Sequence, residues 1–424
     1  MSSWLQSATE RGASVRDWLS PRRQDSLALL RQSQWPSRKT EAWKYIPIDT
    51  WARAELDSVT AQSEPTLPPA IADLNSIDIV FINGVLQSGT LPSELPEGLR
   101  ISALQDGNEN MAWALDSFAA VKPQRHLFGL VNDVLATGGV IVDVAAGARI
   151  EKPLRIVHCM GAGSEAHTRL LVRIGESASL SVVEQFSGDQ LSQSTGFAEY
   201  LLGSESRLEH YRFALQGGAS MSVGGSHFDL SGGAQLVSNV VAFGSALTRL
   251  DVDINHRGEG ARADMNAIYL LDGKELFDLH SNIEHGVPAC TSQENVRGIV
   301  ADNSRAVFNG RIHIHRDAQK TLAELNNRNL LLSPRSEIDT KPELEIYADD
   351  VRCAHGATIA EIDQKAMYYL LSRGISRKQA QVMLSFGFIN ELVDEMPSSA
   401  IAEWLRPQLR ERFAAMEIKS WEEV

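Results

Sequence analysis

The sequence has few cysteines and no long hydrophobic run. Its three cysteines, Cys159, Cys290 and Cys353, are scattered over 424 residues. An odd and dispersed set argues against a disulfide framework and indicates a reducing compartment. No stretch approaches the roughly 18 consecutive apolar residues of a membrane-spanning helix. The first residues also lack a basic segment followed by an apolar run, so no signal peptide is expected. Together these absences predict a cytoplasmic protein.

Several motifs that carry chemistry are also missing. The sequence contains no Gly-x-x-x-x-Gly-Lys-Ser/Thr loop, so we expect no nucleotide to be bound by this chain through a P-loop. It contains no Gly-x-Ser-x-Gly elbow, no His-Glu-x-x-His and no Cys-x-x-Cys. The net charge of −14 disfavours binding to nucleic acid or to anionic membranes. The residues alone therefore show no complete active site.

A recurring turn is the most informative pattern that is present, and it lies in a β-rich region at residues 141–358. Small residues form the bend, and an apolar residue follows at the sixth place. The turns begin at residues 145, 175, 203, 231, 258 and 301, so their spacings are 30, 28, 28, 27 and 43. A fixed period of roughly 20–50 residues marks a stacked architecture. We therefore predict a mainly β fold with a β-solenoid core, and a β-sandwich remains an alternative. The spacing of 43 predicts an inserted coil or loop around Asp272–Gly273.

Residues 1–140 are predicted to be mostly helical, with a small β-hairpin. The hairpin is expected at Asn83–Gly84, which lies between two apolar runs. Residues 37–47 are dense in charge and aromatic side chains. The simplest interpretation of this segment is a packed loop with Trp43 and Tyr45 as its anchors, because aromatic side chains dominate core burial.

Residues 359–424 are predicted to form a C-terminal helical domain. Gly374 is a suitable residue to end a first helix, and a capping box from Ser376 to Gln379 opens the second. A last helix is expected from about residue 399 to residue 416, with Pro407 as a break.

Cys353 and His355 form the first candidate for metal chemistry. Residues two apart in an extended segment project from the same face, and a thiol and an imidazole both suit iron or zinc. Gly356 is expected to turn the chain directly afterwards. Two ligands do not complete a zinc or cluster site, so any others must come from elsewhere, including another chain. The alternative is a buried structural thiol beside a hydrogen-bonded histidine.

Other histidines are weaker candidates. His313 and His315 share a strand face and could ligate a metal as a pair. Their alternation with Ile312 and Ile314 more simply indicates the outward polar face of a coil. His280, His285 and Cys290 show no recognisable ligand spacing and are not expected to form a site.

Several motifs resemble the SufB/SufD family of iron–sulfur cluster assembly proteins. The resemblance is carried by the motifs at 38–47, 305–316, 327–332, 339–358 and 371–375. The long motif that includes Cys353 and His355 is the most specific. The SufB branch carries a scaffold cysteine at the start of the stretch matching residues 336–342. Ser336 stands there in this sequence, which favours the SufD branch.

The resemblance implies a right-handed parallel β-helix between helical domains and a non-catalytic role in the SufB–SufC–SufD complex. It implies that the β-helix pairs with a SufB-like paralogue and that the C-terminal helices dock a SufC-like ABC ATPase. The residues expected at this docking surface are Arg373, Gly374, Ile375, Met383 and Phe388. A homodimer is possible when the SufB-like partner is absent.

The resemblance also implies a role for His355. This residue matches a histidine that faces the partner's cysteine, so it becomes a candidate ligand of a transient iron–sulfur cluster shared between the chains. Cys353 is a weaker candidate. The alternatives are a purely structural adaptor without a cluster ligand and a β-helix carbohydrate-active enzyme. The enzyme would need a cluster of carboxylates and basic residues on one face, which the sequence does not indicate.

Overall fold

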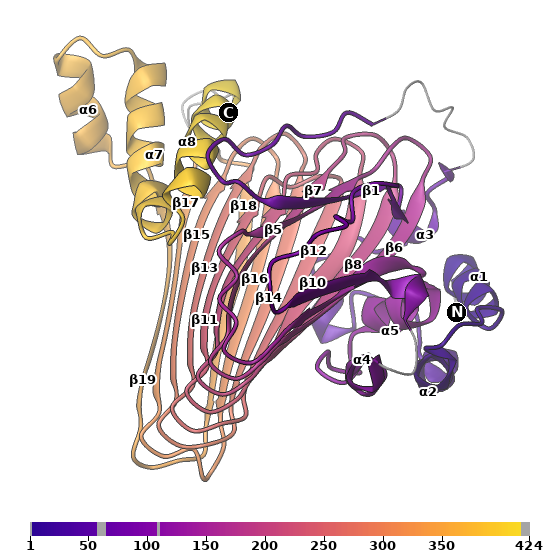
Figure 1. Cartoon of the computed structure of the whole chain (residues 1–424). Helices are drawn as coiled ribbons and strands as arrows, with labels where there is room; N and C mark the ends of the chain where they lie inside the picture. The colour runs from indigo at the N-terminus through magenta and orange to yellow at the C-terminus, as the bar shows by residue number, and fades with distance from the viewer. Residues whose placement is uncertain (1, 57–64, 108–110, 417–424) are drawn as a thin grey trace.

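The computed structural model describes residues 2–56, 65–107 and 111–416. Most of this chain winds into a parallel β-solenoid flanked by N-terminal and C-terminal helices (Figure 1). Alternate strands join two sheets. The ten-stranded sheet has the order β19-β17-β15-β13-β11-β9-β7-β5-β1-β2, and the nine-stranded sheet has the order β18-β16-β14-β12-β10-β8-β6-β4-β3. The prediction of a mainly β solenoid with helical flanks is confirmed.

The strands of the solenoid proper are similar in length and are paired in parallel with the strands one coil away. Their bounds are β4 Gly138–Val144, β5 Leu154–Cys159, β6 Glu165–Ile174, β7 Ser179–Ser187, β8 Gln193–Leu202, β9 Arg207–Ala214, β10 Met221–Leu230, β11 Gln235–Ala242, β12 Leu247–His256, β13 Arg262–Leu271, β14 Leu276–His285, β15 Thr291–Val300, β16 Arg305–Ile314, β17 Leu322–Leu331, β18 Glu337–Ile346 and β19 Arg352–Glu361. The sequence boundary at residue 358 thus lies within β19.

Alternation along each strand places one set of side chains inside the solenoid. Leu170, Val172 and Ile174 of β6 all belong to the interior apolar cluster, as their shared face predicted. Leu171, which interrupts that alternation, is buried on the opposite side against Leu19 and the N-terminal helices. Both faces of β6 carry apolar side chains, since the solenoid interior covers one face and the N-terminal region covers the other.

The expected insertion around Asp272–Gly273 is wrong. These residues form the ordinary turn between β13 and β14, and Gly273 takes a positive φ of 60° there. The turns at 145 to 258 all lie between a strand of the nine-stranded sheet and the next strand of the ten-stranded sheet. The turn at 301 lies between β15 and β16, on the opposite row. The spacing of 43 is therefore about one and a half coils, not an inserted loop.

The N-terminal helices cover the outer face of the nine-stranded sheet. They are α1 Ser3–Gly12, α2 Ser20–Gln32, α3 Asp49–Ala52, α4 Ala112–Ser117 and α5 Leu127–Leu135, with 3-10 turns at Glu41–Trp43 and Leu104–Asp106. Phe128 of α5 packs with Phe197 of β8 in one apolar cluster. Trp43 is buried in the same cluster and Tyr45 packs against it, which confirms these two residues as the anchors of the segment 37–47. Residues 37–42 are exposed.

Three further strands attach the N-terminal region to the first coil. They are β1 Ile77–Ile82, β2 Val85–Leu86 and β3 Leu99–Ala103. The predicted hairpin is present, since Phe81 pairs with Leu86 in antiparallel fashion and both Asn83 and Gly84 take positive φ angles. Strand β1 also pairs in parallel with β5, and β3 pairs with β4 in antiparallel fashion. The first coil is therefore covered by neighbouring strands.

The C-terminal helices are α6 Gln364–Ser372, α7 Arg377–Asp394 and α8 Ser399–Ala415, and Figure 1 shows them at the other side of the solenoid from the N-terminal helices. Helices α7 and α8 share an apolar cluster with the outer face of the ten-stranded sheet. Gly374 has a φ of 81°, and the capping box from Ser376 to Gln379 is formed, as predicted. Residues 417–424 lie outside the described residues.

The expected break at Pro407 is wrong. Helix α8 runs through this residue to Ala415. Leu405 and Leu409, on either side of Pro407, are both buried in the cluster beneath the helix. This packing holds the helix continuous despite the backbone hydrogen bond that a proline removes. Among the described residues, no helix combines the length and the apolar character needed to cross a membrane.

Candidate functional site: the uncovered last coil and a polar groove

The last coil of the solenoid, formed by β18 and β19, has a neighbouring coil on one side only. Burial falls sharply here: every residue of β12 is buried, whereas none in β18 or β19 is fully buried. An uncovered edge strand presents a row of backbone donors and acceptors that another chain can pair with. Large apolar side chains are exposed at the same end, among them Ile346 and Ile359.

Cys353 and His355 lie on β19 and point the same way, as the sequence predicted. They pair with Ala323 and Leu325 of β17, which both belong to the interior cluster. Both side chains therefore face the solenoid axis. His355 is nevertheless exposed, because no further coil covers it.

The two side chains differ as ligands. The imidazole of His355 makes no hydrogen bond or ion pair with any described residue, so both ring nitrogens are free to meet another chain. Cys353 is half-buried, and its burial raises the pKa of the thiol, although a backbone hydrogen bond at Ala323 opposes this. A protonated thiol is a poor ligand. The expected turn at Gly356 is wrong, because β19 continues through it to Glu361.

The residues expected to dock an ATPase lie on α7 and on the connection between α6 and α7. Arg373, Gly374 and Ile375 form that connection, and the Arg373 guanidinium stands over the ring of Tyr369 at 5.2 Å. Met383 of α7 is exposed. Phe388 differs from the others, because it packs against the cluster beneath the helices.

Tyr368 and Tyr369 of α6 were not singled out by the sequence, yet they are 74% and 56% exposed. The prediction of a first C-terminal helix ending at Gly374 gave no sign of which of its side chains would be left uncovered. Large exposed aromatic side chains are typical of residues that anchor a protein interface. Together with Met383 they are the large hydrophobic side chains of α6 and α7 with the greatest exposure among the described residues.

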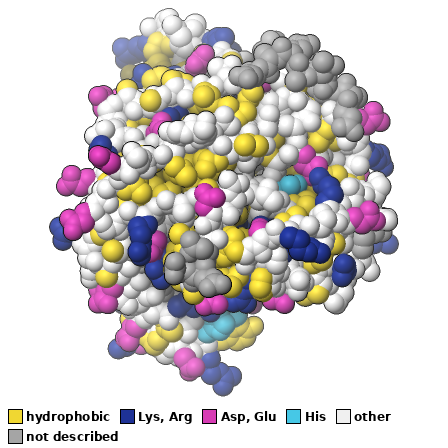
Figure 2. All heavy atoms as spheres, turned by 45° about the vertical axis from the view of Figure 1, so that its right-hand side comes forward, with side chains coloured by type: hydrophobic (Ala, Val, Ile, Leu, Met, Phe, Trp, Pro, Cys, Tyr) yellow, Lys and Arg dark blue, Asp and Glu magenta, His cyan; other side chains and the backbone are white. Residues whose placement is uncertain are grey.

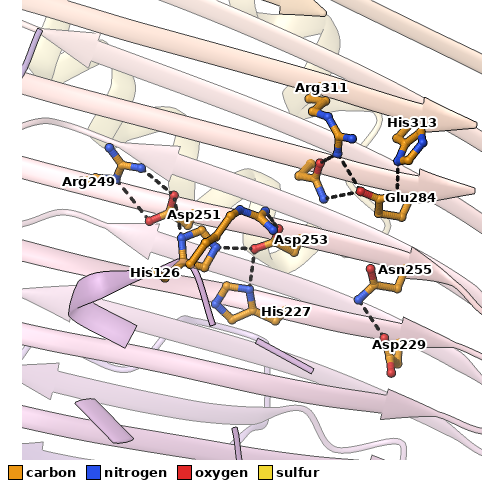
Figure 3. A network of polar contacts seen from close by, with 12 residues as sticks. His126, His227, Asp229, Arg249, Asp251, Asp253, Asn255, Glu284, Arg311 and His313 are labelled. Atoms are coloured by element: carbon orange, nitrogen blue, oxygen red, sulfur yellow. Dashed lines mark hydrogen bonds and ion pairs between the residues drawn. The ribbon is translucent and has the colours of Figure 1, made fainter. Parts of the chain in front are cut away.

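A groove of about 680 Å³ crosses the outer face of the nine-stranded sheet beside Trp43 and α5. Its lining combines both signs of charge with several histidines, and Figure 3 shows how these side chains face one another across β10 to β16. Figure 2 shows positive and negative side chains interspersed over the molecular face that carries the N-terminal helices.

The first histidine cluster in this region is centred on Asp253. Its Oδ2 atom lies 2.9 Å from His126 Nε2 and 2.9 Å from His227 Nδ1, while Arg125 bonds the other oxygen. Burial would raise the pKa of Asp253, but the two histidines hold it well below its ordinary value. Burial lowers the pKa of His227, with the Asp253 contact opposing it. Both carboxylate oxygens are therefore already engaged.

The second cluster joins His313 and His315 to Glu284. Ile312 and Ile314 are fully buried inside the solenoid, which confirms that the two histidines lie on the outward face. Glu284 was missed by sequence reasoning. It precedes His313 by 29 residues and pairs with it across β14 and β16, so the coil period was the signal that could have found it.

The structure places His280, His285 and Cys290 apart from one another. His280 bonds Asp278 on the outer face at 2.9 Å. His285 is buried and stacks on His256, and burial lowers its pKa to about 2. Cys290 belongs to the interior apolar cluster.

The fold defines a helix-flanked parallel β-solenoid with an uncovered last coil. Comparison with known proteins identifies the family of this chain. Residues 158–388 match the family described as SUF system FeS cluster assembly, SufBD core domain, and residues 6–156 match the SufBD protein N-terminal region. The chain belongs to the SufBD family of iron–sulfur cluster assembly proteins.

Individual relatives agree with this assignment. The chain is 30% identical over 402 residues to the iron–sulfur cluster assembly protein SufD of Escherichia coli strain K12, which covers 93% of each chain. It is 25% identical to the chloroplastic protein ABCI7 of Arabidopsis thaliana, over 92% of this chain and 85% of the relative. It is 24% identical to SufD of Bacillus subtilis strain 168, over 67% of this chain and 66% of that relative.

Proposed function

We propose that this chain is the non-catalytic SufD-type subunit of a cytoplasmic iron–sulfur cluster scaffold. In this proposal it pairs with a SufB-like paralogue through the uncovered last coil and docks a SufC-like ATPase through α6 and α7. The observation that carries the proposal is the position of His355, an exposed imidazole without a partner among the described residues, at the one end of the solenoid that no strand covers.

Pairing through the last coil follows from the state of its edge strands. The first coil is closed by β1 and β3, whereas β18 and β19 offer unpaired backbone groups beside exposed Ile346 and Ile359. A related solenoid could add its own last coil to these strands and bury the apolar side chains. A second copy of this chain offers the same edge, which accounts for a homodimer when the paralogue is absent.

His355 then faces the partner chain and serves as one ligand of a transient iron–sulfur cluster shared between the two subunits. Imidazole is a suitable ligand for iron, and ligands from a second chain would complete the set. Cys353 is less suited because burial keeps its thiol protonated.

The helix pair α6–α7 gives the ATPase a surface distinct from the last coil. Tyr368, Tyr369 and Met383 are exposed there, and Arg373 lies beside Tyr369. When the ATPase dimerises on ATP, it pulls on this helix pair and on the equivalent helices of the paralogue. That strain opens the interface and exposes His355 to an incoming cluster.

The test is anaerobic co-expression of a tagged form of this chain with the SufB-like and SufC-like proteins of its own organism, followed by subunit, iron and sulfide analysis. We expect a stable three-component complex that accepts a cluster. A chain that purifies alone, with no affinity for either protein, would refute the proposal.

His355→Ala then tests the ligand role within the complex. It should lower cluster content without releasing a subunit, because the side chain is exposed and unpaired in the chain alone. Thr358→Ala, on the outward face of the same strand, is the matched control and should retain the cluster. Normal cluster assembly in His355→Ala would leave the purely structural adaptor as the correct function.

A further inference from the structure

The three ligand atoms of Glu284, His313 and His315 all lie within 4.8 Å of one another. We propose that these side chains form a binding site for a divalent transition-metal ion, and that the ion is ferrous iron. Two histidines and one carboxylate on one side of a metal, with the other positions open, are the ligand set of non-haem iron(II) sites. This site is separate from His355, which lies on the inward face of the other sheet.

The distances from Glu284 to the two histidines are close to the distance between two ligands of one metal ion. Glu284 Oε2 lies 2.7 Å from His313 Nδ1 and 2.9 Å from His315 Nε2. Two ligands at about 2.1 Å from one metal and at right angles to each other lie about 3.0 Å apart. Small rotations of the three side chains would therefore admit an ion between them.

The sequence and the fold bring the ligands together in a simple way. His313 and His315 project outward on the two sides of buried Ile314, and the rings lie 4.2 Å apart between centroids. The solenoid register places Glu284 beside His313 on the preceding coil. His313 thus lies on β16, His315 directly follows that strand, and Glu284 lies on the neighbouring strand β14.

Arg311 orients the carboxylate. Its Nη1 atom donates to Glu284 Oε1 at 2.6 Å, which leaves Oε2 directed at the two histidines, as Figure 3 shows for His313. Such a hydrogen bond to a ligating carboxylate is a common feature of the residues that surround metal ligands. Arg311 also bonds both oxygens of Glu345, at 2.8 and 2.9 Å. Two carboxylates outweigh the one guanidinium, so the immediate surroundings retain a negative charge.

The Asp253 cluster is a poorer site for the same ion. Arg125 bonds one oxygen of Asp253 as Arg311 bonds one oxygen of Glu284, but His227 is completely buried and the side chain of His126 is only 10% exposed. An ion there would have little access to water or to an incoming ligand. In contrast, His315 is half exposed and the Glu284 site opens to the groove, so water or an incoming ligand can take the remaining positions.

Metal affinity itself does not depend on the proposed scaffold function, but ferrous iron as the physiological ion rests on it. The full chain, purified without partners and freed of metal, should bind one equivalent of Fe²⁺ under anaerobic conditions. Co²⁺ should give visible absorption bands that report the coordination. His313→Ala and His315→Ala should each weaken binding at least tenfold, since each removes one of three ligands.

His280→Ala is the matched control, because His280 lines the same groove outside the triad, and it should bind metal as the wild type does. Circular dichroism verifies the fold of each variant. Absence of saturable binding in the wild type would overturn the proposal, as would unchanged binding in both triad variants or a loss of binding in His126→Ala alone. Co-purification with the SufB-like and SufC-like proteins reports separately on the proposed function, because neither triad histidine lies on β18 or β19.

Discussion

Glu294 is a carboxyl group inside the solenoid, and its removal should change how stability depends on pH. The residue lies on β15 between Met265 and Leu325 of the adjoining coils, and both of these are interior residues. Its Oε1 atom accepts a hydrogen bond from the Ser281 hydroxyl at 2.6 Å. Its Oε2 atom has no partner among the described residues. Burial raises the pKa of Glu294 from 4.5 to about 7, although the Ser281 hydrogen bond opposes the change.

The direction of the effect follows from proton linkage. The unfolded chain releases this proton near the ordinary pKa, and the folded chain releases it only near pH 7. Between these values the folded state binds more protons, so its stability falls as the pH rises. From the two pKa values, the contribution of Glu294 to the free energy of unfolding should fall by about 2–3 kcal/mol between pH 5 and pH 8.

Glu294→Gln removes this titration while keeping the shape of the side chain. Urea unfolding of wild type and variant, followed by far-ultraviolet circular dichroism from pH 5 to pH 8, measures the difference. The wild type should lose about 2–3 kcal/mol more than the variant over this range. Glu324→Gln, at an exposed position of β17, should show the same change of unfolding free energy with pH as the wild type. A constant difference between Glu294→Gln and wild type across the range would show that the buried carboxyl does not carry the effect.

Further predictions concern packing, reactivity and pairing. Phe308→Ala removes a fully buried interior ring and should lower the free energy of unfolding by about 3–5 kcal/mol, where a loss below 1 kcal/mol would contradict its core position. Gly298→Ala would place a methyl group 2.1 Å from the Tyr269 ring. It should lower the free energy of unfolding by about 1–3 kcal/mol in the same urea assay. An unchanged midpoint of urea unfolding would argue against this contact. Because burial raises the pKa of its thiol, Cys353 should react with iodoacetamide at pH 7.5 more slowly than a free cysteine peptide by mass spectrometry, and equal rates would refute this. Ile359→Asp should weaken pairing with the SufB-like subunit at least tenfold in a pull-down titration while changing the chain's own stability by less than about 0.5 kcal/mol, whereas unimpaired pairing would exclude the last coil as the interface.

Much of the fold was accessible from sequence because a solenoid repeats one physical solution. Each coil needs a turn of small residues followed by an inward apolar residue, and that need recurs at about the same spacing. The same argument failed at residue 301, because both rows of turns use similar residues and spacing alone does not distinguish them. Pro407 was misjudged for a different reason: burial of Leu405 and Leu409 outweighs the local preference of the backbone.

The candidate sites were also predictable only in part from the sequence. A spacing of two residues is enough to place Cys353 and His355 on one face, but their exposure depends on the absence of a following coil, which no local pattern states. Glu284 and His313 are neighbours only in the correct register. Coil lengths in the sequence vary between 27 and 30 residues, and a slip of one residue would turn Glu284 to the opposite face. The ligand set therefore becomes visible only once the strands are paired.

The loss of burial along the stack indicates where this chain can meet other molecules. Helix α5 covers the outer face of β6, β8 and β10. Strand β12 is buried throughout, β16 alternates between buried and half-buried positions, and β18 has no fully buried residue. Under the N-terminal layer the polar side chains of the outer face are buried and paired, as Arg169 is with Glu199. Beyond that layer, Glu284 and His313 are partly exposed. The groove lies where the helical layer ends, and the last coil is uncovered because no strand follows β18 and β19 in the two sheets. Glu345 of the last coil joins them directly, because it pairs with His313 in the sheet and bonds Arg311.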